Sequence, residues 1–169
     1  MKAKRITVVF VLAMVVILVS AVPAAARATR IYYTGAECPI TQGDPERQWV
    51  SEDGILHQRG IPVHSIVTSE SPYWLGTNDV VMNTEINLAT GEVHGYGSVS
   101  IHPVAYDGTW DGHFSTHVYT DGTLLGTATV HGTGELEGLK AFNIQSTPLY
   151  PDPACFGMNT IDTGYILIP

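Results

Sequence analysis

Positively charged side chains are scarce in this sequence, and so are the short motifs of well-known catalytic sites. After residue 28 only four Lys or Arg residues stand against sixteen Asp and Glu residues, a net charge of −12 with neutral histidines. Phosphate binding needs clustered Lys and Arg, so the composition excludes nucleic acid as a partner. The chain has no G-x-S-x-G nucleophile elbow, no H-E-x-x-H zinc motif, no P-loop and no D-x-D-x-D-G calcium loop. Function must therefore be argued from individual sites.

Helical periodicity is also missing after residue 28, because no segment holds apolar residues at helical spacing over three turns. From residue 79 to residue 140 apolar and polar residues alternate instead, interrupted by glycine-bearing turns such as Asp121-Gly122. This alternation is the period of half-buried β-strands. We therefore predict an all-β protein, a small antiparallel meander closed into a barrel of about eight strands, with a flat sandwich as the alternative.

The parity of the alternation assigns one apolar face to each of four consecutive strands. The expected inward residues are Val80, Met82, Thr84, Ile86, Leu88, Val93, Gly95, Gly97, Val99, Ile101, Trp110, Gly112, Phe114, Thr116, Val118, Leu124, Gly126, Ala128 and Val130. Five histidines fall on the opposite, polar face: His94, His102, His113, His117 and His131. The inward glycines would let the sheet coil tightly or make room for Trp110 and Phe114.

Further strands are expected on both sides of this meander. Residues 30–34 and 61–68 precede it, and residues 140–145 and 165–168 follow it. Residues 41–52 are expected to form an irregular loop.

The first 28 residues read as an export signal. Three basic residues precede an apolar run (6–22), and a stretch of small residues (24–28) follows. This order is typical of a secretory signal peptide cleaved after Ala26 or Ala28, whereas a retained anchor needs about 20 apolar residues and usually lacks such a site. We expect a secreted or periplasmic protein in which residues 29–169 form a single β-barrel domain.

The two cysteines, Cys38 and Cys155, lie near opposite ends of the exported chain. An even count in an oxidising compartment favours one disulfide. The rival reading is a reactive thiol, but no histidine or helix N-terminus stands beside either residue in sequence to lower its pKa. We predict the disulfide.

Two segments, GTWDGHF (108–114) and HGTGELEGLK (131–140), carry a resemblance. They look like exported bacterial proteins of the allene oxide cyclase and dirigent barrel type, and they are similar to small calycin-like domains of unassigned function. The likeness covers roughly residues 79–145. It implies an eight-stranded barrel whose centre is packed or holds a small apolar pocket, and the binding or positioning of a hydrophobic molecule. No catalytic residue of the plant cyclases matches a position of this chain.

Three features would suggest other chemistry, and each has a structural reading. His113 and His117 lie on the same side of a strand, but three histidines would have to converge to hold zinc or copper, and parity points them to solvent. The run 132–138 lacks the Lys-Ser/Thr pair of a nucleotide loop and is expected to be a strand or bulge junction. Glu135 and Glu137 share a strand face and do not oppose each other across a substrate. No metal and no cofactor is therefore predicted.

The leading functional hypothesis is an exported binding or structural barrel for a small hydrophobic molecule, with Trp110, Phe114 and Met82 as candidate ligand contacts. The alternative is a cyclase- or isomerase-like enzyme acting in the same pocket. An enzyme pocket should contain polar or ionisable inward groups, and parity places only Thr84 and Thr116 there. This favours binding, although whether the protein is an enzyme, its catalytic residues and its oligomeric state stay open.

Two partner classes complete the sequence-based expectations. A protein-interaction module would use the aromatic residues Tyr73, Trp74 and Tyr150 if they are exposed. A membrane partner is not expected after signal cleavage, because an outer-membrane barrel needs an apolar outward face and this one is polar.

Overall fold

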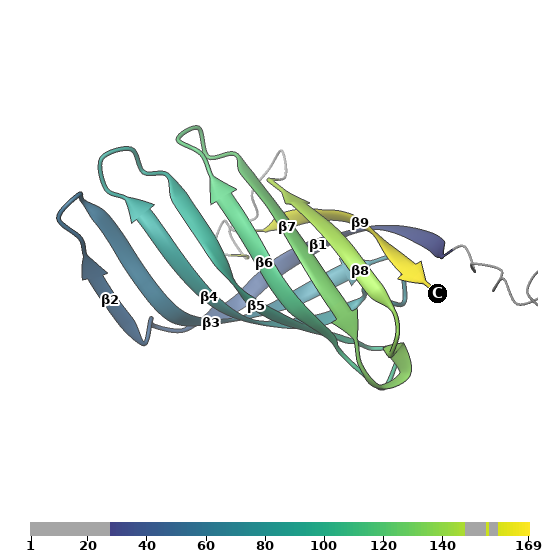
Figure 1. The fold of residues 1–169 in the computed structure, drawn as a ribbon. Coiled ribbons are helices and arrows are strands. Elements are labelled where there is room, and N and C mark those ends of the chain that lie inside the picture. Colours follow the sequence, from purple (N-terminus) through teal and green to yellow (C-terminus); the bar gives the residue numbers. More distant parts are fainter. Residues whose placement is uncertain (1–27, 148–154, 156–158) are drawn as a thin grey trace, which may run out of the picture.

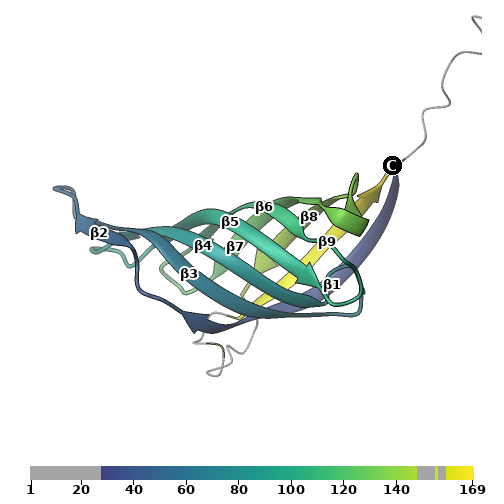
Figure 2. The same ribbon diagram turned by 90° about the horizontal axis from the view of Figure 1, so that it is seen from below.

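The computed structural model describes residues 28–147, 155 and 159–169, which form a closed antiparallel β-barrel (Figures 1 and 2). The strands of this described part are β1 (Thr29–Gln42), β2 (Arg47–Val50), β3 (Ile55–Ser69), β4 (Gly76–Asn87), β5 (Val93–Pro103), β6 (Trp110–Val118), β7 (Leu124–Gly132), β8 (Lys140–Ser146) and β9 (Thr160–Ile168). Strands β3 to β9 pair in chain order, and β1 closes the ring by pairing with both β9 and β3. The predicted all-β barrel is confirmed, and the flat sandwich is excluded.

The face assignment of β4 to β7 holds along most of its length. Trp110 is fully buried and Val99 is buried, while Ile86 and Phe114 are half-buried. On the outer face His94, His102, His113 and His131 are exposed, and His117 is half-buried. Leu88 is a correction, because β4 ends at Asn87 and the Leu88 side chain is 56% exposed in the turn that follows.

Inward glycines bring neighbouring strands close together. A Cβ atom on Gly112 would lie 2.1 Å from the Thr129 carbonyl oxygen, and one on Gly97 would lie 2.0 Å from the Val81 carbonyl oxygen and 3.0 Å from the Phe114 ring. Both expected roles of the glycines therefore occur, since they permit tight coiling and leave room for an aromatic ring.

One end of the barrel is filled by a hydrophobic core. Trp74 and Trp110, with ring centroids 6.3 Å apart, are both fully buried there, and Val67, Val130, Leu136, Ala141 and Ile166 surround them. Trp74 is thus not the exposed interaction residue that the sequence suggested. Tyr73 is half-buried, and Tyr150 lies outside the described residues.

The segment expected to be a strand or bulge junction is instead a loop with one 3-10 turn, η1 (Gly134–Leu136). This correction also separates Glu135 from Glu137, which share no strand face. Leu136 points into the core and is fully buried, so the turn covers the packed end of the barrel.

Strand β3 changes partner along its length. Residues 56–59 pair with β2, whereas residues 63–69 pair with β1. The change follows Gly60, which has φ of 69° and lies in the register shift between Gln58 and Ile61. Strand β2 falls within residues 41–52, so the irregular loop expected there is wrong. The hairpins β2–β3, β4–β5 and β6–β7 lie at the same end of the molecule (Figure 1).

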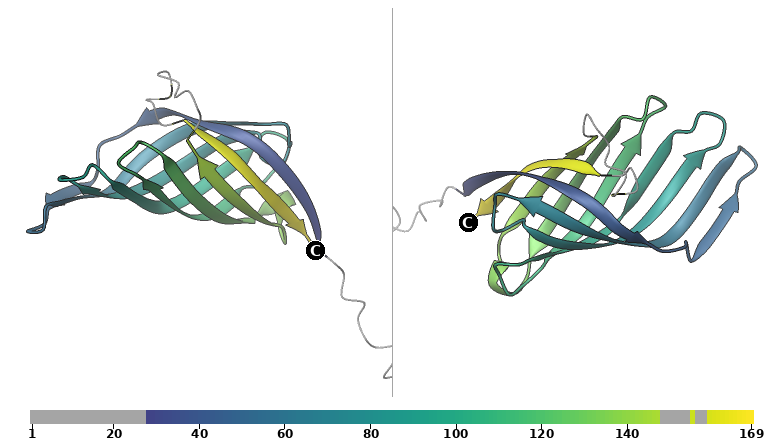
Figure 3. Two further views of the ribbon diagram at one scale, coloured as in Figure 1. Left: turned by 90° about the horizontal axis from the view of Figure 1, so that it is seen from above. Right: turned by 180° about the vertical axis from the view of Figure 1, so that it is seen from behind.

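Strands β1, β3 and β9 are longer than predicted. Strand β1 runs beside β9 from Thr29 to Glu37 (Figure 3). A disulfide joins Cys38 on β1 to Cys155, with Cα atoms 4.9 Å apart, as predicted. The predicted signal peptide falls almost wholly outside the described residues. Among those residues, no helix has the length and apolarity required to cross a bilayer.

Candidate functional site

A cavity of about 390 Å³ occupies the half of the barrel that the hydrophobic core leaves unfilled. Its lining begins at the β4–β5 and β6–β7 hairpins, with Ile86, Val93 and Leu124, and continues inward to Glu37 and Ser65. Gly122, in the β6–β7 turn, belongs to the lining and is exposed, so the cavity opens to solvent at this end. The barrel is therefore packed at one end and hollow at the other.

Apolar side chains form most of the cavity wall. Met82 on β4 and Phe114 on β6, two of the three candidate ligand contacts, line it on either side of Gly97 of β5, together with Val80, Val99 and Val118. The third candidate, Trp110, lies below the cavity in the packed core, where its indole N–H donates to the Tyr73 carbonyl oxygen at 2.7 Å. The three candidates therefore lie at two depths in the barrel, with Met82 and Phe114 at the cavity and Trp110 in the packed core.

The inner end of the cavity is polar. Glu37 accepts hydrogen bonds from the Asn78 amide at 3.0 Å and from the Gln145 amide at 3.1 Å. Behind it Asp162 accepts from the Trp74 indole N–H and from the Thr160 hydroxyl, both at 3.4 Å. Three strands bring these groups together, because Asp162 on β9 is the register partner of Gly35 on β1 and of Gln145 on β8.

Burial makes these two carboxyl groups hard to ionise. Loss of solvent, and then the nearby Asp162 carboxylate, raise the pKa of Glu37 to about 7, against the hydrogen bonds from Ser65, Asn78 and Gln145. Burial also raises the pKa of Asp162, although the hydrogen bonds that it accepts oppose the shift. Near neutral pH the pair therefore holds a proton that either carboxyl would lose in water.

One further polar atom at this end, the Asn78 carbonyl oxygen Oδ1, has no hydrogen-bond partner among the described residues. Asn78 is the register partner of Ser65, whose hydroxyl acts on Glu37, and both residues are only 1–2% exposed and line the cavity. Buried polar groups in folded proteins are nearly always paired, so such an orphan indicates a place that another molecule can satisfy.

Sequence parity missed this polar end because no face was assigned to β1, β3, β8 or β9, and because on β4 the parity was read only from Val80, although Asn78 lies on the same face. The inference that only Thr84 and Thr116 are polar inward residues is therefore wrong. Buried polar residues inside the barrel also include Glu37, Ser65, Asn78, Asn143, Thr160 and Asp162. A signal was present in the alternation of Thr160, Asp162, Gly164 and Ile166 on one face of β9.

No protein-family model and no curated protein sequence matches this chain. The function must therefore be derived from its own geometry.

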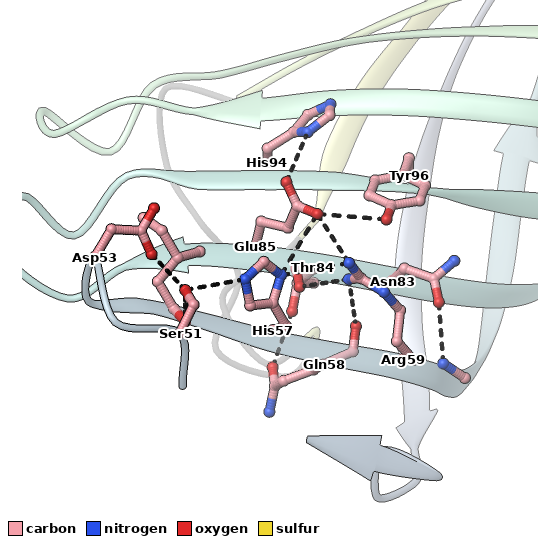
Figure 4. Close-up of polar contacts among 12 residues, drawn as sticks. Ser51, Asp53, His57, Gln58, Arg59, Asn83, Thr84, Glu85, His94 and Tyr96 are labelled. Atoms are coloured by element: carbon pink, nitrogen blue, oxygen red, sulfur yellow. Dashed lines mark hydrogen bonds and ion pairs between the residues drawn. The ribbon is translucent and has the colours of Figure 1, made fainter. Parts of the chain in front are cut away.

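A second polar cluster lies on the outer face of β3 to β5 (Figure 4). The Ser51 hydroxyl lies 3.2 Å from His57 Nε2, and His57 Nδ1 lies 3.6 Å from Glu85 Oε1, which is the order of a serine, histidine and acid triad. Two contacts contradict that chemistry. The Ser51 hydroxyl donates to Asp53 Oδ1 at 2.5 Å, and Arg59 occupies Glu85 Oε1 at 2.8 Å and approaches His57 Nδ1 at 3.4 Å.

Arg59 can only donate, so its contact makes His57 Nδ1 an acceptor and leaves the ring proton on Nε2, where it points at Ser51. Nε2 therefore cannot accept the serine proton. This cluster therefore links the β2–β3 hairpin to β4 and β5 and does not activate a nucleophile. Glu85 carries a lowered pKa because Arg59 donates to it.

Several outer-face histidines contact carboxylates, among them His64 and His102, which share Asp79. Asp79 accepts from His64 at 2.6 Å and lies 3.3 Å from His102, all on the exposed face. Among the described residues, no group of three or more His, Cys, Asp or Glu side chains has an arrangement that could hold a metal ion.

Proposed function

We propose that this protein is an exported β-barrel that binds a small, largely hydrophobic molecule in its lumen. The observation that carries the proposal is the cavity of about 390 Å³, walled by apolar side chains and open to solvent at one end. Ligand sites commonly occupy about 300–1,000 Å³, with apolar walls and a few placed polar groups. The mouth of a β-barrel is a frequent position for such sites.

Export is supported by two independent features. The disulfide between Cys38 and Cys155 indicates an oxidising compartment. The basic, apolar and small-residue order of the first 28 residues is typical of a cleaved secretory signal.

Membership of the allene oxide cyclase and dirigent barrel group, or of the calycin-like domains, remains part of this proposal. The closed eight-stranded ring is the architecture that the resemblance implies. A shared fold does not assign an activity, so the group name supports only the position of the site in the barrel lumen.

A cyclase- or isomerase-like enzyme is the second candidate, and one observation favours it. Glu37 is an ionisable group at the end of an apolar cavity, with a pKa raised to about 7. A group with this pKa can give and take a proton near neutral pH, as a general acid or base must. Polar groups that face the lumen are what an enzyme pocket should contain, so their presence favours this candidate. The serine, histidine and acid cluster on the outer face gives it no support.

Binding is tested with a neutral, environment-sensitive dye such as Nile red and with native mass spectrometry of the exported protein. Met82→Trp fills the cavity from its wall, and Val81→Trp places the same indole on the outer face, where Val81 is 50% exposed. We expect saturable dye binding that Met82→Trp abolishes and Val81→Trp preserves. Equal dye binding by both variants would place the dye outside the lumen and overturn the proposal.

A further inference from the structure

We infer that the inner end of the cavity is a subsite for a protonated amine, so that the ligand is a molecule with an apolar body and a cationic amino group at one end. This inference rests on the proposed function, because it names the chemistry of the ligand that the lumen holds. It is built on Glu37, Ser65 and Asn78, which line the cavity, and on Asp162 behind them.

The first argument is the missing positive charge. Among the described residues, the hydrogen-bond partners of Glu37 and Asp162 are all neutral. No Arg, Lys or His side chain in this part of the chain forms an ion pair with either carboxyl. The four Arg and Lys residues of the described part lie at exposed or outer-face positions: Arg30, Arg47, Arg59 and Lys140. Buried carboxylates are normally paired with a cation, and here a ligand would supply it.

The second argument is the excess of acceptors. The Asn78 amide nitrogen donates to Glu37, which fixes the orientation of the side chain and leaves its carbonyl oxygen without a donor. The Ser65 hydroxyl acts as a donor toward Glu37, and its oxygen can still accept a hydrogen bond. An ammonium group has three donors and no acceptor, so it can donate to the Glu37 carboxylate, to the orphan Asn78 oxygen and to the Ser65 oxygen. A hydroxyl group would bring one donor and a further acceptor.

Other ligand head groups fit this end less well. A carboxylate or phosphate would be buried beside two acidic groups with no cation to offset the repulsion. A hydrated divalent metal requires several oxygen ligands in one shell, and no such cluster of acidic or histidine side chains is found in the described part of the chain. The ammonium group is therefore the head group that best completes the hydrogen bonding.

The charge state of the subsite follows from the groups that face it. The charge of Asp162 on β9 helps to raise the pKa of Glu37. Tyr33 on β1 hydrogen-bonds to Asn143 and also lies near the Asp162 charge. Burial raises the pKa of Tyr33 well above its usual range, so this phenol stays neutral. The group here that changes charge near neutral pH is thus Glu37, and an amine that binds its carboxylate displaces the proton.

The test compares three ligands of equal chain length, octylamine, octanol and octanoate, as competitors of bound Nile red at pH 7.5. We expect octylamine to displace the dye at a concentration at least about tenfold below that of octanol, and octanoate to be the weakest. Octylamine binding should also tighten from pH 5.5 to 7.5 while octanol binding stays constant. Equal potency of octylamine and octanol in the unmodified protein would overturn the inference, even though dye binding itself would leave the binding barrel intact.

Substitution then locates the head group. Glu37→Gln keeps the size of the side chain and removes its charge, so we expect the preference for octylamine over octanol, measured as the ratio of their displacing concentrations, to fall at least about tenfold. Glu135→Gln, an exposed acid outside the cavity, is the matched control and should change nothing. An octylamine preference that persists in a folded Glu37→Gln protein would overturn the assignment. Absence of dye binding to the parent protein would instead contradict the proposed function and this inference together.

Discussion

The Tyr33 ring stacks on the Trp74 indole, with centroids 4.5 Å apart and an interplanar angle of 27°. Both rings also reach one buried polar network, since the Tyr33 hydroxyl donates to Asn143 Oδ1 at 3.2 Å and the Trp74 indole N–H donates to Asp162 Oδ2 at 3.4 Å. The floor of the cavity is therefore joined to the hydrophobic core by two aromatic side chains that each carry a polar end.

Trp74→Phe should separate these two roles. Phenylalanine keeps a ring against Tyr33 but removes the donor to Asp162, so we expect a loss of about 1–3 kcal/mol in the free energy of unfolding. Urea denaturation with the disulfide intact measures it. The control is Trp49→Phe on the exposed β2 strand, which should stay within about 0.5 kcal/mol. Equal losses in the two variants would contradict the role of the buried hydrogen bond.

Trp110→Ala should destabilise the fold strongly, whereas His117→Ala should not. Trp110 is fully buried and its truncation leaves a core cavity, with an expected cost of about 3–5 kcal/mol. His117 lies half-buried on the outer face, where its ring lies 4.4 Å from the Tyr119 ring between centroids, and its removal should cost about 0.5 kcal/mol. Thermal unfolding with and without a chelator checks both. A chelator effect that disappears in His117→Ala would reveal a metal site on the histidine face.

The unliganded protein should lose stability as the pH rises through the range of the buried carboxyls. Glu37 has an ordinary pKa of 4.5 and a folded-state pKa of about 7, so the folded protein binds its proton more tightly than the unfolded chain. The contribution of Glu37 to the unfolding free energy should therefore be largest below pH 4.5 and decrease by about 3 kcal/mol as the pH rises from 4.5 through 7. Asp162, whose pKa is also raised, adds a change of the same sign.

Glu37→Gln tests this pH dependence directly. The variant cannot ionise at this position, so its unfolding free energy should change less between pH 4.5 and 7 than that of the parent protein. Urea denaturation at four or five pH values gives both curves. Parallel curves would show that Glu37 does not titrate in this range.

Removal of the disulfide should weaken both the fold and the site. The bridge closes a loop with a sequence separation of 117, and loops of this size are worth about 4.7 kcal/mol in the chain-entropy model. Cys38 stands between Glu37 and Pro39, which both line the cavity, so its loss should also reduce dye binding. A double serine variant, Cys38→Ser with Cys155→Ser, measures both effects. Mass analysis of the unmodified exported protein should detect no free thiol, and detection of two would contradict the bridge.

The sequence predicted the strands whose inward face is apolar. In β6 the order Trp110, Gly112, Phe114 against Asp111, His113, Ser115 follows the usual pattern, and the structure places the two sets inside and outside as expected. The same regularity predicted the barrel and four of the outward histidines. It also indicated Met82 and Phe114 as residues of the cavity wall.

The polar end of the cavity could not be predicted in this way because the pattern is inverted there. On β9 the buried residues are Thr160 and Asp162 while Ile161 is 39% exposed, and on β8 Asn143 is buried beside Ile144, which is 55% exposed. Alternation alone assigns such apolar residues to the core. Only the register of β1, β8 and β9, which depends on pairing across distant parts of the chain, shows that Glu37 and Asp162 share the lumen.

The change of partner in β3 has a consequence for the shape of the ligand entrance. Since residues 56–59 pair with β2 and residues 63–69 pair with β1, this part of the wall lies outside the closed ring of hydrogen bonds. It is attached to the barrel through β4 on one side and ends in a four-residue edge strand on the other. One side of the cavity entrance is therefore bounded by a short two-sided flap of sheet, and the hydrogen bonds that close the barrel begin only beyond Gly60, where the β1–β3 pairing starts.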